Sequence, residues 1–142
     1  QPTSKFKSKL EEVFNDFLEQ NEISFGYEDF KISYLKPEKP SKYTPDFNCP
    51  IKDNLKIIFE TKGQFLTSDR RKHLQIKQQY PDLDIRFVFS NSKNKIGKKS
   101  KTTYAKWCEL KGFPYHCIQS TKKFLPDEWV IEVKKLQEDK HE

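Results

Sequence analysis

One segment of the chain, YTPDFNCPIKDNLKIIFETKG at residues 43–63, constrains the fold more than any other. It contains two short runs suited to β-strands, residues 43–47 and 55–62, separated by the turn sequence PIKDN. Strands joined by so short a turn pair with each other as an antiparallel hairpin. The apolar run IIF in the second strand predicts that this strand is largely buried in a sheet.

This hairpin is expected to gather ionisable side chains at one end. A turn centred near Asp53 and Asn54 places Asp46 beside Glu60. Glu60 and Lys62 share a face of their strand, because side chains alternate with a period of two. Two carboxylates and a lysine then converge, which suits a divalent cation acting on a phosphodiester. The plain alternative is a surface aspartate beside a cross-strand Glu–Lys pair.

The pattern itself, Pro-Asp followed by Asp/Glu-x-Lys, is not specific. The chain contains three Pro-Asp pairs and five Asp/Glu-x-Lys triplets. Of the others, Asp127 opens a helix and Asp82 follows one, while Glu109, Glu132 and Glu138 lie on helices or in the C-terminal tail. Only Asp46, Glu60 and Lys62 lie on two adjacent short strands, so the candidate site rests on these three.

A helix near the N-terminus is expected to present a fourth acid. Its serine cap is either Ser4 or Ser8. At about 100° per residue, Glu11 borders the apolar stripe of this helix whereas Glu12 faces water. Glu11 can therefore reach a cleft at the edge of the core. The apolar positions of the stripe are Phe6, Leu10, Val13, Phe14, Phe17 and Leu18.

The elements around the hairpin predict a mixed sheet with helices on its faces. Strand parity switches between Tyr27 and Phe30, so a turn is expected near residues 28–29. Residues 36–42 contain two prolines and are interpreted as an extended connector. Strands are expected at 83–90, with Ile85, Phe87 and Phe89 on one face, and at 113–118. This order of elements gives an α/β fold.

Three further helices complete the prediction. One is capped by Ser68 or Asp69 and ends near residue 80. The next is capped by Thr102 or Thr103 and ends at Gly112. The last follows Pro126.

The positive charge of the chain is local. The net charge is +6, and residues 90–111 contain seven lysines and one acid. Such a patch suits a polyanion, although a solvated lysine loop is the plain alternative. We predict DNA backbone contacts from Lys93, Lys95, Lys98, Lys99 and Lys101.

Basic residues at the start of the second helix are candidates for the same role. Arg70, Arg71 and Lys72 lie where phosphate contacts also gain from the helix N-terminus, and a solvated helix face is the alternative. Lys7, ahead of the first helix, is added to the expected DNA contacts. His73 is interpreted as structural, and a DNA role is left open.

Other classes of site and compartment find little support. Cys49, Cys108 and Cys117 form no CxxC pair, which argues against a zinc site or a disulfide framework and fits a reducing compartment. No apolar run reaches the length of a membrane span, and no signal peptide is recognised. No motif for reading base sequence is recognised in the chain.

Four stretches in order, YTPDF, FETKG, SDRRKHLQIKQQYPDLDIRFVFS and LPDEW, resemble the phage endonuclease I family. That family comprises Holliday-junction resolvases within the PD-(D/E)XK nuclease superfamily, and the resemblance covers roughly residues 6–130. It implies a restriction-endonuclease-like fold, with residues 1–142 forming one nuclease domain. It also implies paired cleavage of four-way and branched DNA that leaves 5′-phosphates, in the cytoplasm of a host cell if a phage encodes the chain.

The resemblance implies a role for each site residue. Asp46 would bridge two Mg²⁺ or Mn²⁺ ions, with Glu60 and the carbonyl of Thr61 on one ion and Glu11 on the other. Lys62 would assist the nucleophilic water. Two alternatives stay open: a catalytically idle junction-binding protein of the same fold, and a nuclease of the superfamily that cuts linear duplex.

The resemblance further implies an intertwined homodimer with exchanged strands. Residues 36–42 occupy the position of the bridge between subunits. Exchange would place Glu11 on one chain and the residues of the hairpin on the other. Neither a membrane nor a small-molecule substrate is expected as a partner.

Overall fold

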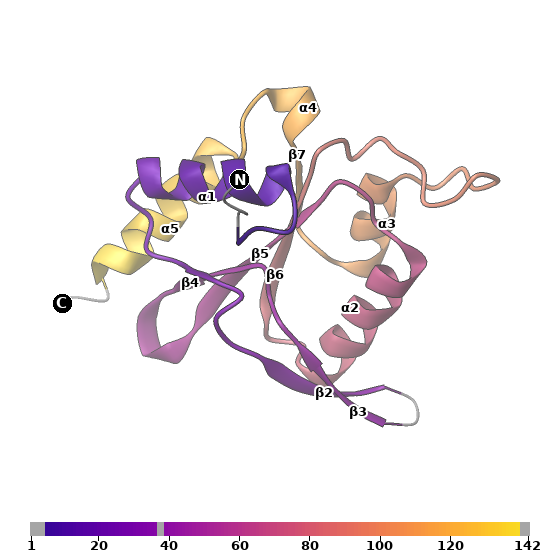
Figure 1. Ribbon diagram of the computed structural model, residues 1–142, viewed down its shortest axis with the longest axis horizontal. Helices are drawn as coiled ribbons and strands as arrows, with labels where there is room; N and C mark the ends of the chain where they lie inside the picture. Colours follow the sequence, from indigo (N-terminus) through magenta and orange to yellow (C-terminus); the bar gives the residue numbers. More distant parts are fainter. Residues whose placement is uncertain (1–4, 37–38, 140–142) are drawn as a thin grey trace.

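A five-stranded mixed sheet forms the centre of the computed structural model, which describes residues 5–36 and 39–139 (Figure 1). The first three strands of the sheet pair antiparallel, and the last three pair parallel. The predicted mixed sheet is confirmed. In spatial order its strands are β1 (Gly26–Tyr27), β4 (Phe47–Pro50), β5 (Lys56–Lys62), β6 (Asp84–Phe89) and β7 (Tyr115–Cys117).

The predicted hairpin is β4 and β5, joined through a short 3-10 turn, η1 (Lys52–Asn54). Phe47 lies opposite Phe59 in the ladder, so one further step along the register puts Asp46 opposite Glu60. The predicted strand at 43–47 is wrong, because β4 begins only at Phe47. Pro45 has no N–H to donate to a ladder, and the chain crosses between two sheets at that point.

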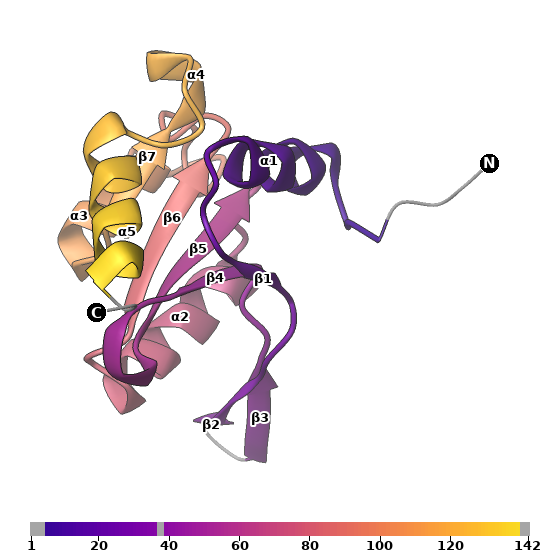
Figure 2. The same cartoon turned by 90° about the vertical axis from the view of Figure 1, so that its left-hand side faces the viewer.

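The smaller sheet is a hairpin of β2 (Ile32–Lys36) and β3 (Lys39–Tyr43), and it projects from one end of the molecule (Figure 2). The interpretation of residues 36–42 as an extended connector missed that Lys39–Lys42 belong to a strand that pairs with β2 of the same chain. Residues 37 and 38 lie outside the described residues. Pro40 is tolerated because β3 pairs only with β2 and needs no second ladder.

Helices cover both faces of the sheet, as predicted. α2 (Thr67–Gln79) and α3 (Tyr104–Lys111) lie on one face, and α1 (Lys9–Gln20) and α5 (Asp127–Asp139) on the other (Figure 1). A short helix, α4 (Ile118–Thr121), which was not predicted, follows β7. None of the helices in the described ranges combines the length and the apolar character needed to cross a bilayer.

The two faces carry separate apolar clusters, since alternate residues of a strand point in opposite directions. Phe87 and Phe89 join the cluster beneath α2 and α3, as the sequence predicted, whereas Val88 joins the cluster beneath α1 and α5. Cluster members on the α2 side include Tyr43, Ile58, Phe65, Ile76 and Trp107. Members on the α1 side include Phe14, Leu18, Phe47, Phe59 and Val133.

Local caps fix where three of the helices begin or end. The hydroxyl of Ser8 accepts from the N–H of Glu11, and Thr103 caps α3 through the N–H of Lys106. Gly112 ends α3 in the left-handed region, with φ 80°. The predicted cap of α2 is wrong: Leu66 precedes the helix, and Asp69 accepts from the Leu66 N–H from within its first turn.

Candidate active site

Asp46 and Glu60 lie side by side where β4 begins and β5 ends, as the hairpin register predicted. The backbone N–H of Asp46 donates to Oε2 of Glu60 over 2.8 Å. Asp46 is 9% exposed and Glu60 is 2% exposed. Buried carboxylates need hydrogen-bond donors or cations around them. The remaining contacts of the site supply these.

Thr61 anchors the Asp46 carboxylate to the end of β5. Its backbone N–H donates to Oδ2 of Asp46 over 3.1 Å, and its hydroxyl donates to the same oxygen over 3.3 Å. Thr61 follows Glu60 in the strand, so their side chains point to opposite faces of the sheet. The strand end thus carries Asp46 on the α1 side and the Glu60 side chain on the α2 side.

Glu11 reaches this strand end from α1, as its position on the helical wheel predicted. It is 5% exposed, and Oε1 accepts from the Tyr27 hydroxyl over 2.6 Å and from the Lys7 N–H over 2.8 Å. Carboxylate oxygens of Glu11, Glu28 and Asp46 all lie within 4.8 Å of one another. One chain alone therefore brings Glu11 and Asp46 together, so exchange of strands is not needed to build this half of the site.

Glu28 belongs to the same group and was missed by the sequence reasoning. Its backbone has φ 46°, and its N–H donates to the carbonyl of Asp46 over 3.0 Å. Its Oε2 is buried without a hydrogen-bond partner among the described residues, with the Lys7 ammonium 3.3 Å away. The switch of strand parity at residues 28–29 was the only signal in the sequence, and it indicated a turn rather than a ligand.

Lys62 connects the site to α2. Its ammonium lies 3.8 Å from Oε1 of Glu60 and 3.5 Å from Oδ1 of Asp69. The Lys62 side chain is 15% exposed, so its charge is only partly screened by water. Burial opposes the charged form, but the carboxylates of Glu60, Asp46 and Asp69 outweigh it and raise the pKa of Lys62. Lys62 is therefore a cation at neutral pH.

Two aromatic side chains hold Glu60 from the α2 side. The Tyr43 hydroxyl donates to Oε2 of Glu60 over 2.9 Å. Nε2 of His73 lies 3.6 Å from Oε1, and neither ring nitrogen of His73 has a hydrogen-bond partner in the described part of the chain. His73 is fully buried, and burial lowers its pKa, so the imidazole is neutral at pH 7. The interpretation of His73 as a residue of the interior fits this position.

The two central acids differ in charge. Burial, Glu60 and Glu11 raise the pKa of Asp46 to about 8, against the opposing effect of Lys62. Burial also disfavours ionised Glu60, but its contacts with His73, Lys62 and the Asp46 N–H lower its pKa. Without a bound cation, Glu60 is ionised at neutral pH and Asp46 is largely protonated. Crowded carboxylates of this kind are stabilised by a cation.

The donor set fits a hard divalent cation. All its ligand atoms are oxygens, which Mg²⁺ and Mn²⁺ prefer. Oε2 of Glu28, which is buried and pairs with the exposed Lys7 ammonium, belongs to the same group. The site can therefore hold a cation between α1 and the end of β5, with Lys62 beside it.

The predicted DNA contacts differ in exposure, and Lys72 is half-buried. The lysines of the loop between β6 and α3 are exposed, and so is Arg71. Arg70 is buried, and its guanidinium donates to the carbonyl of Phe65 and to the hydroxyl of Thr67. The side chain of Arg70 therefore makes contacts inside the protein, which was not predicted from the sequence. The Lys7 ammonium is exposed and pairs with Glu28 beside the acidic group.

Comparison with known proteins agrees with the resemblance noted in the sequence. A sequence model described as phage endonuclease I matches residues 1–141. Endonuclease I of Escherichia phage T7 is 43% identical over 130 residues, which cover 92% of this chain and 81% of the relative. Endodeoxyribonuclease 1 of Enterobacteria phage T3 is 44% identical over 130 residues, covering 92% of this chain and 80% of the relative.

Proposed function

The chain belongs to the phage endonuclease I family, and from that premise we propose that it is a divalent-metal-dependent endodeoxyribonuclease that resolves four-way and branched DNA. Its relatives are named as an endonuclease and an endodeoxyribonuclease. We further propose that residues 1–142 act as one nuclease domain of the PD-(D/E)XK type. The three cysteines are free, which supports a reducing compartment such as the cytoplasm of an infected cell.

The observation that carries the proposal is the meeting of acids and one lysine at the end of β5. Asp46, Glu60 and Lys62 come from the hairpin, and Glu11 comes from a separate helix. A salt bridge on a surface needs only two of these groups. Three carboxylates and a lysine held in a partly buried cluster suit the hydrolysis of a phosphodiester.

Mg²⁺ or Mn²⁺ would be held by these oxygens. Asp46, Glu11, Glu60 and the carbonyl of Thr61 would hold these ions. When bound, such ions lower the pKa of water and stabilise charge on a phosphodiester. The protein supplies a fixed set of oxygens, because Thr61 and Tyr43 restrain the carboxylates.

Lys62 is proposed to stabilise charge at the reacting phosphate. Its raised pKa keeps it protonated at neutral pH, so it counters growing negative charge more readily than it removes a proton. Asp69 keeps the ammonium at the site from the side of α2. Cleavage by this route is expected to leave a 5′-phosphate and a 3′-hydroxyl.

The DNA surface is proposed to include the exposed lysines of the loop between β6 and α3. In Figure 1 this loop extends away from the sheet beside α3. None of the salt bridges among the described residues involves these lysines, so their charge is available to phosphates. Arg71 and Lys72 extend the surface along α2, and Arg70 is left out because it is buried. The proposed loop contacts are Lys93, Lys95, Lys98, Lys99 and Lys101.

A cleavage assay tests the function. The protein is incubated with a synthetic four-way junction and with a linear duplex of the same sequence, each with and without Mg²⁺. We expect the junction alone to be cut, and only with Mg²⁺. Asp46→Ala and Glu60→Ala are expected to bind the junction without cutting it. A junction that is bound but never cut by the native chain contradicts the enzymatic proposal, and equal cutting of the duplex contradicts junction selectivity.

We propose that the active form is a homodimer that exchanges strands at the β2–β3 hairpin. The hairpin projects from the body of the molecule, and opening it would carry α1 to a second copy without changing the local contacts of the site (Figure 2). Glu11→Ala and Asp46→Ala chains, refolded together, should then recover one complete site per heterodimer. Recovery requires sites shared between chains, and its absence would show that each chain builds its own.

A further inference from the structure

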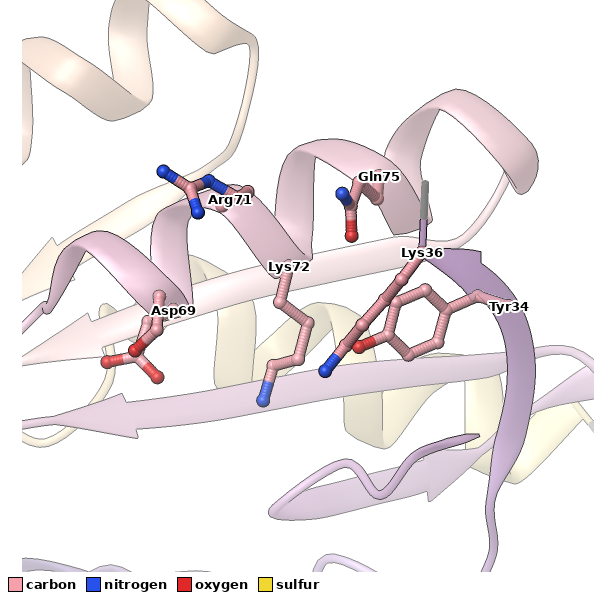
Figure 3. Close-up of a pocket in the computed structure, with 7 residues that line it drawn as sticks. Tyr34, Lys36, Asp69, Arg71, Lys72 and Gln75 are labelled. Atoms are coloured by element: carbon pink, nitrogen blue, oxygen red, sulfur yellow. The ribbon is translucent and has the colours of Figure 1, made fainter. Parts of the chain in front are cut away.

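A basic pocket lies between α2 and the end of β2, outside the group of carboxylates. It has a volume of about 450 Å³, and Figure 3 shows the side chains that line it. In this view the side chains of Lys36 and Lys72 extend in the same direction, and both residues line the pocket together with Tyr34. Arg71 points away from them. Two lysines from separate elements therefore converge on one space.

Among residues 5–36 and 39–139, no salt bridge neutralises the charge of these lysines. Asp69 is the acid that lines the pocket, but its Oδ1 pairs with Lys62 and its Oδ2 accepts from the Leu66 N–H. Lys36 and Lys72 therefore present two positive charges to one pocket, which favours an anion there. The pocket thus has the chemistry of an anion site.

The position of Lys36 is set by side-chain contacts between β2 and α2. The Gln79 side chain bonds to both the N–H and the carbonyl of Leu35, each over 2.7 Å. The Tyr80 hydroxyl donates to the carbonyl of Ser33 over 2.6 Å. Lys72 lies with its ammonium 5.6 Å from the centre of the Tyr43 ring. Both lysines therefore extend from backbone that is fixed before any ligand arrives.

The pocket adjoins the candidate active site. Asp69 lines the pocket and pairs with Lys62, which in turn lies 3.8 Å from Glu60. Tyr43 also links the two places, because its hydroxyl bonds to Glu60 while its ring faces Lys72. An anion in the pocket would lie on the α2 side of Lys62, across β5 from Glu11.

We propose that this pocket binds a second backbone phosphate of the DNA strand that is cut, with Lys36 and Lys72 as its ligands. The proposal rests on the proposed function, since it takes the strand to pass over the end of β5. A contact on each side of Lys62 fixes both the position and the direction of the strand. Phosphate contacts of this kind orient a substrate without reading its sequence.

Neutral phosphates in the DNA test the proposal. Single methylphosphonates, which remove one negative charge, are placed at successive positions on both sides of the cut in a four-way junction. Binding is measured with Ca²⁺ in place of Mg²⁺. Native protein should lose about tenfold in affinity at the contacted position. The double variant Lys36→Gln with Lys72→Gln should bind the unmodified junction more weakly and show no further loss at that position.

Two controls test whether the effect of the double Gln variant comes from unfolding or from the lower net charge of the protein. Lys134→Gln, on the exposed face of α5, should keep the full positional effect of the methylphosphonate. Lys36→Arg with Lys72→Arg should restore most of the affinity. If the double Gln variant still loses about tenfold at every position where native protein does, the pocket holds no DNA phosphate and the proposal is overturned.

A free anion is distinguished by adding inorganic phosphate at constant ionic strength. Competition by phosphate that depends on Lys36 and Lys72, without any positional effect of methylphosphonates, would assign the pocket to a free anion and overturn the DNA proposal. Failure of the proposed function looks different. In that case native protein does not cut the junction with Mg²⁺, whereas the positional effect on binding persists.

Discussion

The backbone N–H of Asp46 donates to Oε2 of Glu60 over 2.8 Å, so the main chain of one acid holds the carboxylate of the other. Strand register, and not contact between the two side chains, therefore sets their spacing. The arrangement leaves the Asp46 carboxylate free to turn toward Glu11 and Glu28. Folding therefore changes the pKa of Asp46, and this change affects the pH dependence of stability, which can be measured.

Asp46→Asn should stabilise the metal-free protein at alkaline pH. The pKa of Asp46 rises from 3.8 to about 8 on folding, so the unfolded chain ionises first and native stability falls as pH rises from about 4 to about 8. Asparagine keeps the acceptor for Thr61 and lacks this penalty. Because a tenfold difference in acidity corresponds to about 1.4 kcal/mol, the variant in EDTA should exceed the native protein by a few kcal/mol near pH 8 and by little near pH 4.

Urea unfolding at the two pH values measures the difference. Asp53→Asn, in the exposed η1 turn, is the matched control and should show no such dependence on pH. If Asp46→Asn raised the free energy of unfolding equally at both pH values, the raised pKa of Asp46 could not be the cause.

Tyr43→Phe should weaken metal binding without unfolding the protein. The hydroxyl that it removes donates to Oε2 of Glu60, and loss of such a supporting hydrogen bond typically lowers metal affinity about tenfold. Titration calorimetry with Mn²⁺ gives the affinity directly. Tyr115→Phe removes a similar 2.7 Å bond to Glu109 at an exposed position and should leave Mn²⁺ affinity unchanged. Equal Mn²⁺ affinities for native protein and Tyr43→Phe would show that the Tyr43 hydroxyl does not support metal binding.

Lys62→Gln should slow cleavage while preserving binding of the junction. The ammonium lies between Glu60 and Asp69, and removal of a group that counters charge in the transition state typically costs about 10²- to 10³-fold in rate. Single-turnover cleavage at saturating protein and Mg²⁺ isolates this step. Lys52→Gln, in the exposed η1 turn, serves as the control. A rate that is unchanged by Lys62→Gln would exclude the proposed role.

Arg70 and Arg71 should separate stability from DNA binding. Arg70→Ala removes bonds to Phe65 and Thr67 from a buried guanidinium, so we expect a loss of about 2 kcal/mol in unfolding free energy. Arg71→Ala removes an exposed cation and should weaken junction binding at unchanged stability. Thermal unfolding and fluorescence anisotropy on both variants check the pair. The reverse pattern would return Arg70 to the DNA surface.

The lysine loop should govern the salt dependence of DNA binding. Lys98→Gln combined with Lys99→Gln removes two exposed charges, and the slope of log affinity against log salt should fall by about one for each phosphate that the variant no longer neutralises. Lys134→Gln with Lys135→Gln makes the same change of charge on α5 and should leave the slope near that of native protein. If both pairs change the slope equally, net charge and not the loop determines binding.

Periodicity was enough to place Asp46, Glu60 and Glu11. A hairpin fixes which residues face each other, and a helix fixes which residue borders its apolar stripe, so both relations follow from counting along the chain. The same counting failed for residues 43–47, where Pro45 interrupts the ladder between two sheets. The hairpin of β2 and β3 was missed for a related reason, because Pro40 is tolerated on a strand that has one neighbour.

Glu28, Tyr43 and Arg70 could not be assigned from local pattern. Glu28 joins the acidic group because its backbone has φ 46°. The alternation of the strand is interrupted there, so the direction of its side chain cannot be predicted by counting residues. Tyr43 meets Glu60 only after the chain crosses from the small sheet to the large one. Arg70 is buried because its guanidinium donates to the carbonyl of Phe65, five residues earlier. The sequence does not show which of three adjacent basic residues makes this contact.

The β2–β3 hairpin separates the residues of the candidate site into two groups along the chain. Everything before it contributes Glu11 and Glu28, and everything after it contributes Asp46, Glu60 and Lys62. A gene cut at that point would encode two fragments, neither of which carries the complete set of acidic residues.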